Sequence, residues 1–200
     1  MRYAAIDIGS NAIRLLIKDI DESNADDLQP ERIAYYRVPL RLGGDVFERG
    51  KLSKAKTKSL VKVMVAFRNL IDVQEVAACR AVATSALRSA RNRDEVIEAV
   101  LSKTGIEIVC LSGEEEAGLI FQNFDDAGRK FNRDLLCIDV GGGSTELSIV
   151  RENERIALKS FKLGTVRMLK GTTPEGEWMR IREFLRQHRG DKPWLAIVTS

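Results

Sequence analysis

Histidine is almost absent from this 200-residue sequence, and cysteine and proline are scarce. The one histidine, His188, lies in the polar stretch RQHRG, where we expect an exposed helix end. One histidine excludes a histidine-rich metal cluster, and a Ser-His-Asp triad would have to use this residue. If the chain is an enzyme, its acids, bases and ligands must be carboxylates, hydroxyls, backbone amides and cations.

Long apolar runs are also missing, and none exceeds five residues. A transmembrane helix needs about 20, and Asp7 interrupts the N-terminal stretch where a signal peptide would be apolar. Cys79, Cys110 and Cys137 are far apart, odd in number and without zinc spacing, which predicts reduced core cysteines. We therefore expect a cytoplasmic protein with no membrane partner, and the net charge of +3 is too small to indicate nucleic acid.

The residues that are present describe an ordinary globular chain of one large or two small domains, with 44% hydrophobic and 30% charged residues. Hydrophobic periodicity predicts a helix from Ser53, its capping residue, to Ile71, a helix over Asn92–Lys103 and another after Gly113. The predicted strands are Tyr3–Ile8, Ile13–Lys18, Arg32–Leu42, Glu75–Ala83 and Ile106–Leu111. This order favours an α/β fold in which helices flank a mixed sheet.

One short pattern occurs twice. Ile6-Asp7-Ile8-Gly9 returns in the last third of the chain as Ile138-Asp139-Val140-Gly141, and both copies lie between two apolar strands. Chance is the alternative for so short a pattern, but the matching strands on both sides favour an internal duplication. The polar stretch 125–133 separates the copies. We predict a first lobe at 1–125, a linker at 126–132 and a second lobe at 133–200. The apolar segment Trp194–Ser200 stops without a turn, so we expect the second lobe to be truncated.

The second copy continues into the most informative segment, a glycine turn between two strands. Gly141, Gly142 and Gly143 let backbone N–H groups approach a ligand, and Ser144 adds a hydroxyl, as Thr145 does. Such a turn suits phosphate oxygens. Carboxylates bracket the turn at Asp139 and Glu146, and Mg²⁺ or a similar cation would bridge them to bound phosphate. The alternative is a plain hairpin turn, which needs fewer glycines.

Three further features are candidates. The turn Gly9-Ser10-Asn11 is the first copy of the same phosphate loop. Arg88 follows a predicted strand, where it could bind a phosphate or be a surface arginine. Ser112-Gly113 opens a helix with three glutamates, at positions 114, 115 and 116. Carboxylates are favoured in a first helical turn, and the residues alone do not show which of the three could act as a general base.

Four segments resemble one family, the exopolyphosphatase/guanosine pentaphosphate phosphohydrolase (Ppx/GppA) family of the actin-like superfamily. They are DIGSNAIRLLI at 7–17, ATSALRSARN at 83–92, SGEEEAGLIF at 112–121 and DVGGGSTEL at 139–147. The resemblance implies an actin-like (ribonuclease H-like) fold of two lobes, with one phosphate loop in each lobe. It also accounts for the repeat. Family members continue well past residue 200, so the resemblance leaves open whether this chain alone is active.

The resemblance also implies roles for residues. Glu116, immediately before the alanine of the glutamate motif, corresponds to the catalytic base. Asp139 and Glu146 correspond to the acidic residues associated with Mg²⁺ (or Mn²⁺) and the attacking water. Arg88 corresponds to an arginine that faces the phosphates. The loop residues correspond to the two phosphate loops.

The implied reaction is hydrolysis of a terminal phosphoanhydride in polyphosphate or a phosphorylated guanosine nucleotide. Two other functions stay open at this point. An actin-like ATP-dependent kinase would share both loops, and a non-catalytic sensor would bind phosphorylated nucleotides in the same cleft. A homodimer is also left open. Release of phosphate from polyphosphate without an acceptor separates the three functions.

Overall fold

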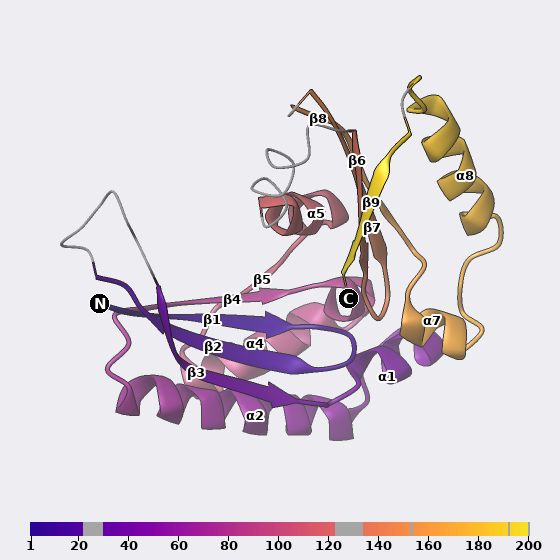
Figure 1. Cartoon of the computed structure of the whole chain (residues 1–200). Coiled ribbons are helices and arrows are strands. Elements are labelled where there is room, and N and C mark those ends of the chain that lie inside the picture. The colour runs from indigo at the N-terminus through magenta and orange to yellow at the C-terminus, as the bar shows by residue number, and fades with distance from the viewer. Residues whose placement is uncertain (22–29, 123–133, 153, 192, 200) are drawn as a thin grey trace. The chain divides into compact units, whose positions relative to one another are not determined.

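The structure, a computed structural model, describes all residues except 22–29, 123–133, 153, 192 and 200. The chain divides into two compact units, Met1–Cys110 and Leu111–Ser200 (Figure 1). The predicted linker at 126–132 lies outside the described residues. The division itself falls earlier than the predicted end of the first lobe at 125. The reason is helix α5 (Gly113–Gln122), which packs on strands of the second unit.

The first unit contains one mixed sheet of five strands in the order β3-β2-β1-β4-β5. Its strands are β1 (Arg2–Ile8), β2 (Ile13–Asp19), β3 (Glu31–Val38), β4 (Ala78–Ala83) and β5 (Ile108–Cys110). Its helices are α1 (Leu42–Arg49), α2 (Lys54–Val73), α3 (Ser85–Ser89) and α4 (Arg93–Thr104). The neighbouring helices α2 and α4 lie along one face of the sheet (Figure 1).

Residue periodicity explains how this unit forms its core. Every second residue of β1 and β2 is buried, as the alternating pattern requires of a sheet with one covered face. In α2, the buried side chains are Leu60, Met64, Phe67 and Ile71, which recur at helical spacing. As predicted, Ser53 caps α2, and its hydroxyl accepts the N–H of Lys56 at 3.3 Å.

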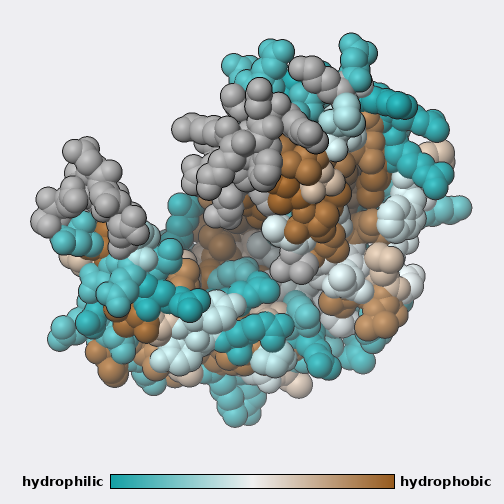
Figure 2. Space-filling model, viewed as in Figure 1, coloured by the Kyte–Doolittle hydropathy of each residue, from teal (hydrophilic) through white to brown (hydrophobic). Residues whose placement is uncertain are grey.

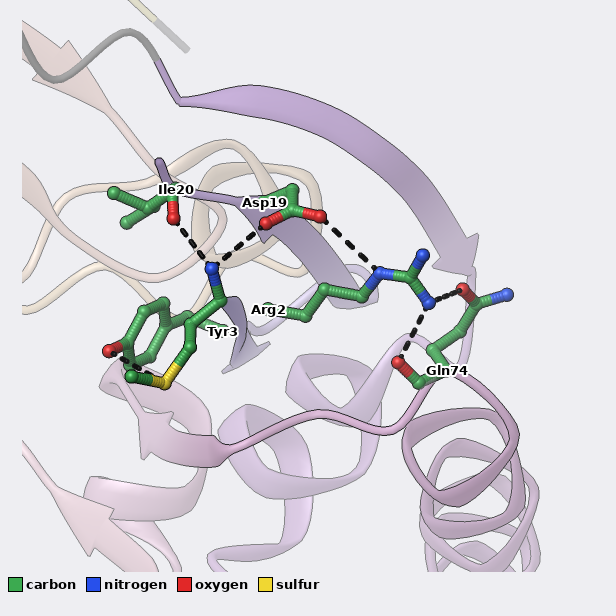
Figure 3. Close-up of polar contacts among 6 residues, drawn as sticks. Arg2, Tyr3, Asp19, Ile20 and Gln74 are labelled. Atoms are coloured by element: carbon green, nitrogen blue, oxygen red, sulfur yellow. Dashed lines mark hydrogen bonds and ion pairs between the residues drawn. The ribbon is translucent and has the colours of Figure 1, made fainter. Parts of the chain in front are cut away.

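Polar contacts fasten the start of β1 (Figure 3). The terminal ammonium of Met1 donates to the carbonyl of Ile20 at 2.6 Å and pairs with Asp19 at 3.1 Å. The Arg2 guanidinium donates to the backbone oxygen of Gln74, just after α2, at 3.0 Å. These bonds hold the open end of the β1–β2 hairpin, and the turn at Gly9 lies at its other end.

The second unit contains a four-stranded mixed sheet in the order β8-β7-β6-β9. Its strands are β6 (Leu135–Val140), β7 (Thr145–Arg151), β8 (Glu154–Phe161) and β9 (Leu195–Thr199). Besides α5, its helices are α7 (Thr165–Leu169) and α8 (Glu177–Gln187). One apolar cluster includes Phe184 of α8 with Leu147 and Ile149, and another joins Ile120 of α5 to Leu135 and Val150. Because alternate residues point to opposite faces, α8 and α5 cover the two faces of this sheet.

The two units share one chain path, which supports the predicted duplication. In each, a hairpin pairs with a third antiparallel strand, two helices follow, and the next strand pairs parallel with the first. Even the irregularities match, because the pairing shifts between Ile17 and Lys18 in β2 and between Ile149 and Val150 in β7. The sequence offset from Ile17 to Ile149 is the same as the offset from Asp7 to Asp139.

Several elements differ from the sequence prediction, among them helix α1, which was not predicted. The predicted strand Arg32–Leu42 ends at Val38, because Leu42 begins α1 and buries its side chain with Val46 and Phe47. The short helix α3 and the strand β8 were not predicted at all. Hydrophilic atoms predominate along part of α8 in Figure 2, and Trp178 and Met179 of the same helix are also exposed. Among the described residues, no helix is long and apolar enough to cross a membrane.

Candidate functional site

The glycine turn between β6 and β7 is held from one side by the start of α7. The Gly141 carbonyl accepts the N–H of Thr165 at 3.0 Å, and the Gly142 carbonyl accepts the N–H of Val166 at 2.8 Å. The Gly143 carbonyl accepts the guanidinium Nε of Arg167 at 2.8 Å. Three consecutive carbonyls of the turn are therefore fixed on the α7 side.

The carbonyl positions determine where the amides of the turn point. In a trans peptide, the C=O of one residue and the N–H of the next point in opposite directions. The N–H groups of Gly142, Gly143 and Ser144 are therefore directed away from α7. Among the described residues, none of these three N–H groups donates a hydrogen bond within the protein. Successive backbone N–H groups on one side of a turn suit an anion such as phosphate.

Close packing explains why this segment needs glycine. A Cβ atom on Gly164 would lie 2.5 Å from the carbonyl carbon of Gly142, so a larger residue would push α7 away from the turn. Thr145 has a different place from the one predicted for it. It is buried, and its hydroxyl donates to the carbonyl of Leu163 at 2.6 Å, so that it supports the turn from behind.

Two carboxylates lie beside each other just behind the turn. Asp139 and Glu146 are directly opposite in the β6–β7 register, so both side chains lie on the same face of the sheet. Glu146 is 3% exposed; its Oε1 accepts the Ser160 hydroxyl at 2.8 Å, and its Oε2 is buried with no partner in the described part of the chain. Burial, the charge of Glu116 and the charge of Asp139 raise the pKa of Glu146 to about 7, against the lowering effect of two serine hydroxyls.

The structure distinguishes the three glutamates of α5, which the residues alone did not. Glu115 forms a reciprocal cap, because its carboxylate accepts the N–H of Ser112 at 2.8 Å and its own N–H donates to the Ser112 hydroxyl. Glu114 is exposed. Glu116 is half-buried, and its charge acts on Glu146. The second unit thus brings Glu116, Asp139 and Glu146 to the covered face of one sheet.

The first unit presents the matching turn Gly9-Ser10-Asn11. The Ser10 carbonyl accepts the N–H of Gly43 at 2.8 Å, and the Asn11 carbonyl accepts the N–H of Arg41 at 2.8 Å. The start of α1 therefore holds this turn as α7 holds the other. The Ser10 hydroxyl also lies 3.0 Å from that of Ser85, the first residue of α3, which follows β4.

Arg88 lies on α3 and is half-buried, within the first unit. Arg14, which faces Asp7 across the β1–β2 hairpin, was not among the predicted site residues. Its guanidinium pairs with the Asp7 carboxylate at 2.7 Å. The signal was present in the repeat, because Arg14 and Glu146 occupy the same register position in the two hairpins, opposite the repeated aspartate.

Two sheets with the same path, each with a turn clasped by the following helix, define the class as a duplicated α/β protein of the actin-like kind. Comparison with known proteins then gives the family. The sequence model of the Ppx/GppA phosphatase family matches residues 19–187, so this chain belongs to that family. The resemblance and the fold class inferred from the motifs are both confirmed.

Individual relatives agree with this assignment. The chain is 33% identical to exopolyphosphatase 1 of Mycobacterium tuberculosis over 88% of this chain and 50% of the relative. It is 32% identical to a guanosine-5'-triphosphate,3'-diphosphate pyrophosphatase of Vibrio vulnificus over 98% of this chain and 38% of the relative. The crystal structure of an exopolyphosphatase from Cytophaga hutchinsonii superposes with a TM-score of 0.77 at 26% identity, covering 94% of this chain and 60% of that one. This chain therefore spans about half, or less, of the length of these two curated relatives.

Proposed function

We propose that the protein hydrolyses a terminal phosphoanhydride bond, in inorganic polyphosphate or in guanosine pentaphosphate. The observation that carries this proposal is the pairing of two features in the second unit. Three N–H groups of the glycine turn are directed to one side, and an acidic group with no partner for one buried oxygen among the described residues lies just behind the turn. The first feature suits phosphate oxygens, and the second suits a cation and a base. The names of the relatives support both substrates.

In this proposal, Glu116 is the general base. It is half-buried near Glu146, whereas Glu115 is used as a helix cap and Glu114 is exposed. Its carboxylate would accept a proton from the attacking water, as general bases do.

The phosphate oxygens would be held by backbone amides. In the second unit these are the N–H groups of Gly142, Gly143 and Ser144, which α7 directs to one side of the turn. In the first unit, the turn residues Ser10 and Asn11 and the half-buried Arg88 are the candidates for phosphate binding. A guanidinium and backbone amides both suit a phosphate anion.

Asp139 and Glu146 fit a divalent cation. The buried Glu146 Oε2 lacks a partner among the described residues, and the nearby carboxylates oppose its ionisation. Mg²⁺ commonly uses one or two carboxylates and completes its shell with waters and substrate phosphates. When bound, such an ion supplies charge stabilisation to a phosphoryl group. Among the described residues, no group of three or more His, Cys, Asp or Glu side chains could hold a metal ion, so waters and substrate would have to supply most of the ligands.

The test is phosphate release from long-chain polyphosphate, without nucleotide or acceptor, in Mg²⁺ or in excess chelator. We expect release that needs the cation, with guanosine pentaphosphate assayed in parallel to rank the two substrates. Release only when an acceptor is added would identify a kinase instead. Binding of polyphosphate without any release would identify a sensor. Undiminished hydrolysis in chelator would remove the cation from the proposal.

A further inference from the structure

Arg167 is an unusual residue for its position. It belongs to the short helix α7 and is only 9% exposed, whereas arginine is seldom so buried. Its Nε donates to the carbonyl of Gly143, the last glycine of the turn, at 2.8 Å. Several described hydrogen bonds hold the three glycine carbonyls of the turn. Arg167 Nε donates one of them from a side chain, and backbone N–H groups donate the others.

In the first unit, a different kind of donor binds the equivalent carbonyl. Asn11 is the counterpart of Gly143 in the first copy of the repeat, and its carbonyl accepts a backbone N–H, that of Arg41. The second turn has three consecutive glycines, whose backbone is free to adopt many conformations. A backbone contact reaches the first two carbonyls, and the guanidinium reaches the third. The Gly143–Ser144 peptide is planar, so fixing its carbonyl also fixes the direction of the Ser144 N–H.

We infer that Arg167 is a positioning residue for the phosphate turn, which directs the Ser144 amide toward a phosphate oxygen. This inference rests on the proposed function, because it assumes that the turn binds phosphate. The arginine does not touch the ligand in this account. It acts through the Gly143–Ser144 peptide, and its buried charge adds positive potential behind the turn.

The experiment compares Arg167→Lys and Arg167→Met with the unaltered protein, and uses Arg182→Met as a matched control on the exposed side of α8. Lysine keeps the charge but not the directional Nε–H. The first readout is the NMR spectrum of the backbone amides during titration with tripolyphosphate. We expect the Ser144 amide signal to shift in the unaltered protein and not to shift in either variant. The amide signals of Asn11 and of Ala12, the counterparts of Gly143 and Ser144 in the first turn, should still shift.

The second readout is turnover of polyphosphate, separated into kcat and KM. We expect Arg167→Lys to lower kcat about tenfold to a hundredfold, the range seen when the partner of an active-site ligand is removed, with a smaller change in KM. A Ser144 response and a kcat equal to those of the unaltered protein would overturn the positioning role. So would a uniform weakening of all the amide responses, since a merely structural residue would cause that.

Two other outcomes are equally decisive. If Arg167→Met fails to fold, the lysine variant decides the question, and loss of the fold in both would assign the residue to stability and overturn the inference. If the unaltered protein neither responds to tripolyphosphate nor releases phosphate, the proposed function itself is overturned, and this inference falls with it.

Discussion

The two units run along the same path, but they use one equivalent pair of positions in opposite ways. In the first hairpin, Asp7 faces Arg14, and the two charges neutralise each other at 2.7 Å. In the second hairpin, Asp139 faces Glu146, and the charges repel. A salt bridge needs no ligand, whereas a buried carboxylate such as Glu146, with a second carboxylate beside it, is costly unless a proton or a cation joins it.

The two pairs of charged residues also differ in how deeply they are buried. The Asp7 and Arg14 side chains are each more than a third exposed, so solvent screens their interaction. Glu146 is 3% exposed, because α5 packs on β7 and β8. At this pair of positions the first hairpin thus holds a solvent-screened ion pair, and the second holds a carboxylate whose ionised form is disfavoured. Two copies of one hairpin can therefore keep the same backbone and differ in the charge opposite the repeated aspartate.

The largest expected effect concerns the base. Glu116→Gln should lower polyphosphate turnover by about 10²–10⁴, the usual worth of a general base, and should leave polyphosphate binding intact. Glu114→Gln and Glu115→Gln are the matched controls in the same helical turn, and their turnover should stay within a few-fold of normal. Steady-state phosphate release measures all three. Near-normal kcat in Glu116→Gln would show that Glu116 is not the general base.

The next effect is on stability and its pH dependence. The pKa of Glu146 is raised from 4.5 to about 7 by folding, so the folded unit holds an extra proton between these values. Stability therefore falls as the pH rises from 4.5 through 7. Glu146→Gln removes the cost of ionising this side chain in the folded unit. The free energy of unfolding of the variant should therefore be larger than that of the unaltered protein by ~3 kcal/mol at pH 8, and by little near pH 4.5.

This measurement can be confined to one unit. Both tryptophans, Trp178 and Trp194, belong to the second unit, so their fluorescence during urea unfolding in chelator reports that unit. The exposed Glu183→Gln is the control and should show no gain. A gap between Glu146→Gln and the unaltered protein that does not change with pH would contradict the strained pair.

A smaller effect tests the helix contacts that both units use. Gly164→Ala should destabilise the second unit by about 2 kcal/mol, because the new Cβ would meet the backbone of Gly142 at 2.5 Å. Gly43→Ala in α1 should cost the first unit less, since the nearest atom, at 2.7 Å, belongs to the Phe47 side chain and the nearest backbone atom, the Ser10 carbonyl oxygen, is 3.2 Å away. Gly44→Ala, with no atom within 4 Å, is the control. Equal losses at Gly164 and Gly44 would disprove close packing at the turn.

The smallest effect is expected for the first hairpin. A double-mutant cycle of Asp7→Asn and Arg14→Gln should give a coupling energy below about 1 kcal/mol, and salt should reduce it further. All three tyrosines are in the first unit, so near-ultraviolet circular dichroism can follow its unfolding. A coupling of several kcal/mol would show that this pair, like its counterpart, is effectively buried.

Much of the fold was predictable where the evidence lies close together in the chain. The two hairpins, α2 with its Ser53 cap and α4 all follow from local periodicity. Helix α1 was missed because Gly43 and Gly44 weaken its helical pattern, and β8 because none of its residues 154–159 is buried. Both elements are stabilised by distant partners, α1 by the first turn and β8 by β7.

Two features could be predicted from the residues: two related turns that each follow an aspartate, and carboxylates rather than histidines beside the second turn. These properties depend on residue identity and short spacing alone. The folded chain was needed to show that the charge of Glu116 acts on Glu146 while Glu115 caps its helix. It was also needed to show that Asp7 has an arginine opposite it where Asp139 has a glutamate. The physical reason is that a charge acts through space, so strand register and helix packing choose its neighbours.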